Sequence, residues 1–138
     1  MTHWSTEDEA FMRKAIELAE RGAGFVAPNP KVGCIITDES GRIIGEGWHE
    51  KFGESHAEVN AHRSITPNDL HHLPRSNWYV TLEPCNHLGK TPACAGLIES
   101  IRPKRVLIGT VDCNPKVSGG GIERLRQAGI RVETGCLE

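Results

Sequence analysis

The spacing of apolar residues predicts an amphipathic helix near the start of the chain. Between residues 11 and 19 apolar side chains recur three or four positions apart, and Gly22 ends the run. Upstream, Thr6 and Glu9 stand three residues apart, which is the spacing of a capping box. We therefore expect a helix that begins with this pair and covers one face of a sheet.

Five short apolar runs have the length and composition of β-strands. The first two are joined by the polar turn Asp38–Gly41 and predict a hairpin. Further helices are expected from Ser55, after the cap and first-turn pair Thr91-Pro92, and after a run of glycines at 119–121. The proline-interrupted stretch 65–77 is predicted to be a surface loop. The five strands are expected at residues 32–37, 43–48, 78–82, 105–110 and 130–133.

The order of these elements predicts the class of fold. A hairpin followed by strands that alternate with helices indicates an α/β protein with a mixed sheet and helices on both faces. Crossover helices place the loops that carry chemistry at the carboxyl ends of the strands. A length of 138 residues suits a single domain, 1–138, with a substantial buried core.

Composition and charge exclude several classes of function. The net charge of −2 gives no general affinity for phosphate backbones, and 5% aromatic residues offer few stacking surfaces, so nucleic acid is not expected as a partner. No apolar run approaches the ~20 residues of a membrane span. The first residues, Met1 to Trp4, show no secretory signal.

One histidine, one glutamate and two cysteines form the pattern with the clearest chemistry. His56 and Glu58 stand two apart, and Cys85 and Cys94 follow, in the order H-x-E and P-C…C typical of zinc deaminases. A catalytic zinc takes three protein ligands and keeps its fourth position for water, whose pKa it lowers to about 7. We expect His56, Cys85 and Cys94 as the ligands and Glu58 as the group that moves protons.

Two other interpretations of these residues remain open at this stage. Ser55 and Glu58 also have capping-box spacing, which would explain Glu58 without catalysis. His56 and Glu58 can converge only in the first turn of a helix, because residues two apart do not share a helix face. His87 could supply a fourth ligand and close a purely structural zinc site.

The odd number of cysteines, five, indicates a reducing, cytoplasmic compartment rather than a disulfide framework. Cys34, Cys113 and Cys136 have no partner at ligand spacing and are expected to be structural.

The zinc loop from Thr81 to Cys94 resembles that of the riboflavin-pathway pyrimidine deaminases, the deaminase domain of a bifunctional deaminase–reductase. Two positions differ from the family's usual residues, since Ala93 and Cys113 stand where proline is common. The resemblance covers nearly the whole chain and includes residues 28–33, 47–49, 53–59, 112–115 and 119–122.

This resemblance implies a three-layer α/β/α cytidine-deaminase-like fold with a central mixed five-stranded sheet. It implies zinc as cofactor, the phosphorylated ribosylamino-pyrimidine of riboflavin synthesis as substrate, and substrate contacts from Asn29, His49, His87 and Lys90. A homo-oligomer, and a reductase as a fused domain or separate partner, are also implied.

Two alternative functions stay open beside this one. The chain could be another deaminase of the same fold, acting on guanine, cytidine or a tRNA adenosine, or a non-enzymatic zinc-binding module. Lys90 is the expected phosphate contact, and the glycine turn before Ile122 is either a second place for an anion or a plain flexible loop.

Overall fold

The computed structural model describes residues 5–27, 30–51, 54–83, 94–110 and 120–135. Each predicted strand is present within one residue of its expected bounds, and each predicted helix is present in its expected place; the stretch 65–77 differs from the prediction. The elements are α1 (Thr6–Glu20), β1 (Gly33–Thr37), β2 (Ile43–Trp48), α2 (Ala57–Arg63), the 3-10 helix η1 (Pro67–Arg75), β3 (Asn77–Leu82), α3 (Cys94–Ile101), β4 (Arg105–Thr110), α4 (Gly120–Gln127) and β5 (Arg131–Thr134).

The strands form one mixed sheet in the order β2-β1-β3-β4-β5. β1 pairs antiparallel with both β2 and β3, whereas β3, β4 and β5 run parallel to one another. The predicted hairpin and the predicted mixed sheet are therefore confirmed. Because β3 and β4 are parallel, their carboxyl ends, at Leu82 and Thr110, lie at the same end of the sheet.

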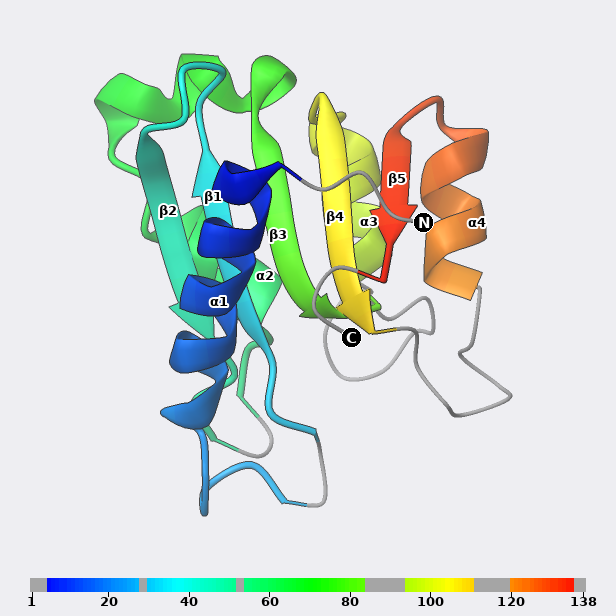
Figure 1. The fold of residues 1–138 in the computed structure, drawn as a ribbon. Helices are drawn as coiled ribbons and strands as arrows, with labels where there is room; N and C mark the ends of the chain where they lie inside the picture. The colour runs from blue at the N-terminus through cyan, green and yellow to red at the C-terminus, as the bar shows by residue number, and fades with distance from the viewer. Residues whose placement is uncertain (1–4, 28–29, 52–53, 84–93, 111–119, 136–138) are drawn as a thin grey trace.

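Side chains that alternate along the strands divide the core into two layers. Ile35, Tyr79 and Leu107 pack with residues of α1, among them Met12. The opposite face, with Cys34, Ile36, Trp78, Val80, Val106 and Ile108, packs against α2, α3 and α4. Figure 1 shows α1 in front of the sheet and the other three helices behind it, which confirms the predicted three layers.

Two local predictions were wrong. Ser5, not Thr6, is the N-cap of α1, and its hydroxyl accepts the N–H of Asp8 at 2.9 Å. The cap lies one residue earlier than predicted because adjacent Ser and Thr can both cap a helix. With the helix starting at Thr6, the side chain of Asp8 points inward and makes a buried ionic contact. The predicted loop 65–77 contains a 3-10 helix because Pro67 suits a first turn and Leu73 is buried against the core.

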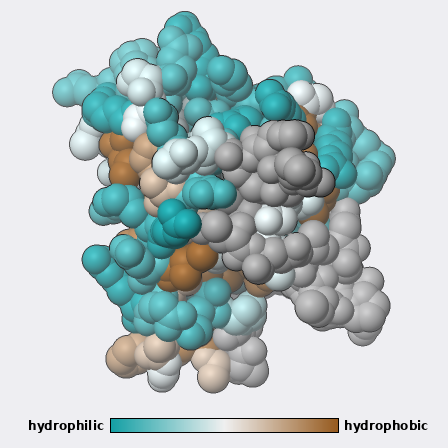
Figure 2. Space-filling view, viewed as in Figure 1, coloured by the Kyte–Doolittle hydropathy of each residue, from teal (hydrophilic) through white to brown (hydrophobic). Residues whose placement is uncertain are grey.

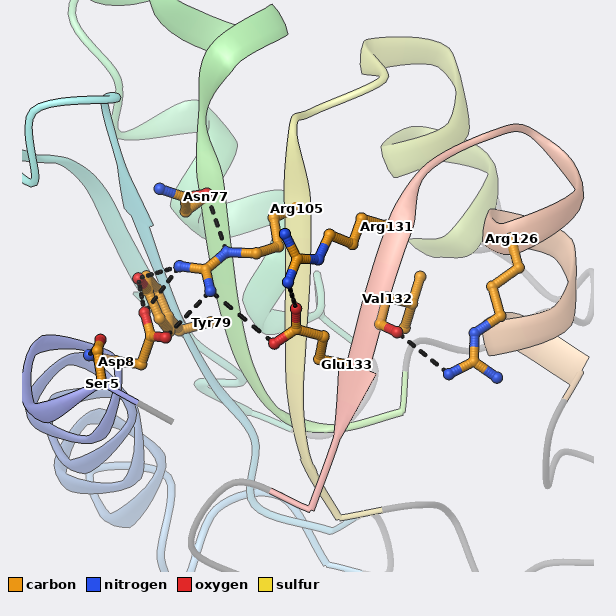
Figure 3. A network of polar contacts seen from close by, with 9 residues as sticks. All are labelled: Ser5, Asp8, Asn77, Tyr79, Arg105, Arg126, Arg131, Val132 and Glu133. Atoms are coloured by element: carbon orange, nitrogen blue, oxygen red, sulfur yellow. Dashed lines mark hydrogen bonds and ion pairs between the residues drawn. The ribbon is translucent and has the colours of Figure 1, made fainter. Parts of the chain in front are cut away.

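That ionic contact joins the start of α1 to the sheet (Figure 3). Arg105 donates to both carboxylate oxygens of Asp8, at 2.7 and 3.0 Å, and the Tyr79 hydroxyl donates to the same carboxylate at 2.8 Å. Burial by itself raises the pKa of Asp8, but the hydrogen bonds from Arg105 and Tyr79 outweigh it and hold this pKa below its ordinary value. Asp8 therefore stays ionised in the folded protein at neutral pH.

We expect Asp8→Asn to lower the free energy of unfolding at pH 7 by about 3 kcal/mol, the lower end of the range for breaking a buried ion pair. The lower end applies because Arg105 keeps a second carboxylate nearby, that of Glu133 at 3.9 Å. The lowered pKa of Asp8 means that its contribution is complete above the unfolded pKa of about 3.9 and is lost as pH falls through the folded pKa. Urea unfolding between pH 3 and 7 should therefore show a flatter acid limb in Asp8→Asn than in wild type.

The exposed pair of Glu9 and Arg13 on the same helix supplies the control. Glu9→Gln should change stability by no more than about 0.5 kcal/mol. If the two substitutions lowered the free energy of unfolding equally, the buried contact of Asp8 would contribute no more to stability than an exposed ion pair.

Two glycines of β2 let α2 lie directly on the hairpin. A Cβ on Gly47 would come within 2.4 Å of the backbone nitrogen of Ala61, and one on Gly45 within 2.6 Å of its carbonyl oxygen. No real side chain tolerates such contacts, so these positions fix how closely α2 approaches the sheet. The start of α2, with His56 and Glu58, is positioned by this packing.

We expect Gly47→Ala to destabilise the fold by about 1–3 kcal/mol, since the added methyl group must push α2 off the sheet. The same shift should weaken zinc binding. Gly96→Ala in α3 is the matched control: its Cβ would meet only the end of the Arg124 side chain at 3.2 Å, and alanine favours the helix by about 1 kcal/mol. Urea unfolding of both variants tests the expected loss of stability. An unchanged free energy of unfolding in Gly47→Ala would contradict it.

Candidate metal and catalytic site

The starts of α2 and α3 meet at a histidine and a cysteine. His56 is the N-cap of α2, with an extended backbone (φ −74°, ψ 168°) and no side-chain capping bond. Its Nδ1 lies 3.3 Å from Sγ of Cys94, the first residue of α3. Two residues that stand 38 positions apart are thus brought together by two helix starts on the same face of the sheet.

This pair fits a zinc ion. Zinc bonds of about 2.05 Å to nitrogen and 2.3 Å to sulfur, at a tetrahedral angle, set the two ligand atoms about 3.5 Å apart, close to the distance observed. Cys94 is 1% exposed and begins a helix, where the dipole favours a thiolate. Within the described ranges no group of three or more metal-binding side chains occurs, and the third predicted ligand, Cys85, lies outside them.

Glu58 is a buried acid in the first turn of α2, with 3% of its surface exposed. The capping-box interpretation is wrong, because His56 and not Ser55 is the N-cap. The Ser55 hydroxyl instead accepts a hydrogen bond from Arg63 at 3.0 Å. Glu58 therefore stands at the opening turn of α2, two positions from the metal-binding candidate His56, as the catalytic hypothesis requires.

His49, predicted from the resemblance, lies beside His56. The two rings are 5.2 Å apart and meet edge to face, and His49 is 3% exposed. Its Nδ1 lies 3.1 Å from the Ser55 carbonyl oxygen. A carbonyl oxygen only accepts, so Nδ1 is the donor in this contact.

Asn60 belongs to this group and was missed by the sequence analysis. Its Nδ2 donates to the carbonyl oxygens of Trp48, at 2.8 Å, and Ser55, at 3.2 Å. It thereby ties the end of β2 to the residue before His56. Its place four residues after His56, on the same helix, was the only available signal.

Cys34 lies fully buried on β1, in keeping with its predicted structural role. Burial raises the pKa of its thiol well above the ordinary value, and the negative charge of Glu58 raises it further. Cys34 thus stays a neutral thiol on the strand behind the site. The other cysteines expected to be structural, Cys113 and Cys136, lie outside the described residues.

The remaining predicted site residues also lie outside the described part of the chain. They are the ligand Cys85 and the substrate contacts Asn29, His87 and Lys90. Their assignments stay predictions.

The glycine turn before Ile122 does hold an anion, but that anion belongs to the protein. The carboxylate of Glu83 accepts the N–H groups of Gly121, at 3.1 Å, and Ile122, at 3.3 Å, in the first turn of α4. Glu83 is 4% exposed. The last two glycines of the turn, Gly120 and Gly121, belong to α4, and the N–H groups of Gly121 and Ile122 are engaged by Glu83. The first part of the turn, residues 118–119, lies outside the described residues. Sequence analysis missed Glu83, whose only signal was its place before Pro84-Cys85.

A separate groove of about 290 Å³ lies on the other side of the sheet, between α1 and the ends of β3 and β4. It is lined by Met12, Ile16, Thr81 and Leu82 among others, and not by His56, Glu58 or Cys94. On the face that carries α1, the described residues in view are mostly hydrophilic, with apolar residues in small patches (Figure 2). No helix in the described ranges is long and apolar enough to cross a membrane.

Comparison with known proteins places this arrangement in a family. Residues 5–110 match the family model described as the cytidine and deoxycytidylate deaminase zinc-binding region. A diaminohydroxyphosphoribosylamino-pyrimidine deaminase of Buchnera aphidicola is 45% identical over 131 residues, covering 95% of this chain and 86% of that protein. The riboflavin biosynthesis protein RibD of Escherichia coli is 44% identical over 131 residues, covering 95% of this chain.

A solved structure agrees over the same region. It is the diaminohydroxyphosphoribosylaminopyrimidine deaminase/5-amino-6-(5-phosphoribosylamino)uracil reductase of Thermotoga maritima, 49% identical, with a TM-score of 0.86 over 96% of this chain. The chain spans 37% of that protein and 34% of the Escherichia coli one, so these relatives are much longer. The fold, the zinc cofactor and the family indicated by the resemblance are confirmed: the chain belongs to the zinc-binding cytidine and deoxycytidylate deaminase family and, within it, to the diaminohydroxyphosphoribosylamino-pyrimidine deaminases.

Proposed function

We propose that this protein is a hydrolytic deaminase of riboflavin biosynthesis. It converts 2,5-diamino-6-ribosylamino-4(3H)-pyrimidinone 5′-phosphate to 5-amino-6-ribosylamino-2,4-pyrimidinedione 5′-phosphate. Water adds to the amine-bearing ring carbon, the bond from that carbon to the amino nitrogen breaks, and ammonia leaves. The observation that carries the proposal is the meeting of His56 and Cys94 at 3.3 Å, with Glu58 buried at the same helix start.

His56, Cys94 and Cys85 would hold the zinc, which when bound lowers the pKa of water enough for attack at neutral pH. Glu58 takes one proton from the attacking water to the ring nitrogen beside the attacked carbon, and then moves the second proton from the new hydroxyl to the departing amino nitrogen. One carboxylate thus serves as base and as acid. Its burial keeps competing water away. Asn60 and His49 hold the Ser55 carbonyl and so steady the backbone before His56.

The substrate contacts form part of the same proposal. His49 lies beside His56, where its ring would help to orient the ribose and the pyrimidine ring. Asn29 and His87 would orient the ring and ribose, and Lys90 the phosphate. A homo-oligomer in the cytoplasm, working with a reductase as a fused domain or separate partner, completes the proposal.

The experiment is an assay of ammonia release from the phosphorylated riboflavin intermediate, compared with cytidine, deoxycytidylate, guanine and a tRNA adenosine. Release from the intermediate alone supports the proposal. Faster release from another base would favour the related deaminase activity instead. If the zinc-loaded protein released ammonia from none of these substrates, the result would favour the remaining alternative, a non-enzymatic zinc-binding module.

Lys90→Ala tests how the phosphate is recognised. A lysine–phosphate contact in a partly buried site is worth roughly 1.5–3 kcal/mol, so kcat/KM for the phosphorylated substrate should fall about tenfold to a hundredfold. The dephosphorylated substrate should react poorly with wild type and hardly worse with the variant. Equal slowing of both substrates would show that Lys90 supports the loop or the ring.

A further inference from the structure

Glu83 connects the end of β3 to two other elements. Its backbone N–H donates to the Thr110 carbonyl oxygen at 2.9 Å, which continues the parallel pairing of β3 with β4. Its buried carboxylate accepts the N–H groups of Gly121 and Ile122 at the start of α4. The residue is therefore held by both its backbone and its side chain, immediately before the segment 84–93.

The helix that Glu83 caps is itself fastened to α3, whose first residue is Cys94. Arg124 of α4 donates through Nε to Glu99 of α3 at 3.0 Å. Its guanidinium also lies over Gly96, 3.2 Å from where a Cβ would stand. Buried apolar residues of both helices belong to one hydrophobic cluster: Ile122 and Leu125 from α4, and Ala95 and Ile98 from α3.

We propose that Glu83 is a positioning residue that sets the two ends of the 84–93 segment relative to each other. This inference rests on the proposed zinc site, in which Cys85 and Cys94 are ligands. Cys85 follows Glu83 by two residues, so anchoring the Glu83 carboxylate on α4 restricts where the chain can place that thiolate. Because α4 also holds α3, one continuous series of contacts runs from Glu83 to the helix that begins with Cys94.

The alternative is that Glu83 merely caps α4 and adds stability. Zinc affinity and ligand geometry separate the two roles, because a plain cap changes neither in the folded protein. Residues that orient metal ligands typically cost 10–100-fold in metal affinity when they are removed.

The test compares Glu83→Ala, Glu83→Gln and Asp8→Asn in the full chain. The zinc dissociation constant is measured by competition with a chromophoric chelator, the cobalt(II)-substituted protein gives a visible spectrum, and urea gives stability. We expect Glu83→Ala to bind zinc 10–100-fold more weakly and to show an altered cobalt spectrum. Glu83→Gln should lie between it and wild type, because its amide oxygen still accepts hydrogen bonds.

Asp8→Asn is the matched control, since it loses a buried carboxylate on the opposite face of the sheet. It should be less stable yet keep the wild-type zinc affinity and cobalt spectrum. Unchanged zinc affinity and spectrum in a folded Glu83→Ala would overturn the inference; if that variant does not fold, the same readouts on Glu83→Gln decide. A wild type that binds no zinc would overturn the proposed site as well, whereas a wild type that binds zinc and releases ammonia leaves the proposed function standing.

Discussion

Glu58→Gln is expected to lower kcat by at least about 10⁴-fold while the protein keeps its zinc. General acid–base catalysis is typically worth 10² to 10⁴ in rate, and here one carboxylate would act both at attack and at departure of ammonia. Glutamine has the same shape and hydrogen-bonding reach but cannot accept the proton. Since Glu58 is only 3% exposed, bulk solvent cannot easily replace it.

Single-turnover rates, zinc content and urea unfolding of the same preparation make this test sharp. Glu46→Gln, at an exposed carboxylate of β2, controls for loss of a negative charge and should leave all three unchanged. A Glu58→Gln variant that is folded, contains zinc and turns over near the wild-type rate would reduce Glu58 to a structural residue of the first turn of α2.

Helix starts show where reasoning from sequence reached its limit in this chain. Ser5 and Thr6 are adjacent capping residues, and sequence alone could not choose between them; the contact of Asp8 with Arg105 fixes the register. At α2 the predicted cap Ser55 is engaged by Arg63, and His56 takes the cap position. Both errors were of a single residue, and both came from side-chain partners that are distant in the sequence or lie on another turn of the same helix.

The candidate site divides in the same way. Zinc accepts few side-chain types, and the order H-x-E followed by P-C…C pointed to His56 and Cys94, which the structure brings together. Asn60 and Glu83 act on backbone groups: Asn60 binds two carbonyl oxygens, and Glu83 binds two N–H groups. Every residue offers a carbonyl oxygen and every residue but proline an N–H, so no spacing rule could reveal these contacts before the fold was known.

Loss of zinc is the largest single effect expected from substitution at this site. Cys94→Ser and Cys85→Ser each replace a thiolate with a hydroxyl that stays protonated at neutral pH, and His56→Ala removes the nitrogen that lies 3.3 Å from the Cys94 sulfur. Zinc content should fall from one per chain to near zero in all three. Ammonia release should fall to the uncatalysed level.

Two controls decide what such a loss means. Cys34→Ala removes another buried cysteine, one that stays a neutral thiol on β1, and should keep one zinc per chain. His87→Ala should also keep the metal if the site has three protein ligands and leaves a position for water, whereas zinc loss there would favour the closed, structural site. Metal analysis after gel filtration measures the zinc content of each variant directly. Full zinc content in Cys94→Ser would contradict the ligand assignment. The 3.3 Å approach of Cys94 to His56 would then serve only to pack the starts of α2 and α3 together.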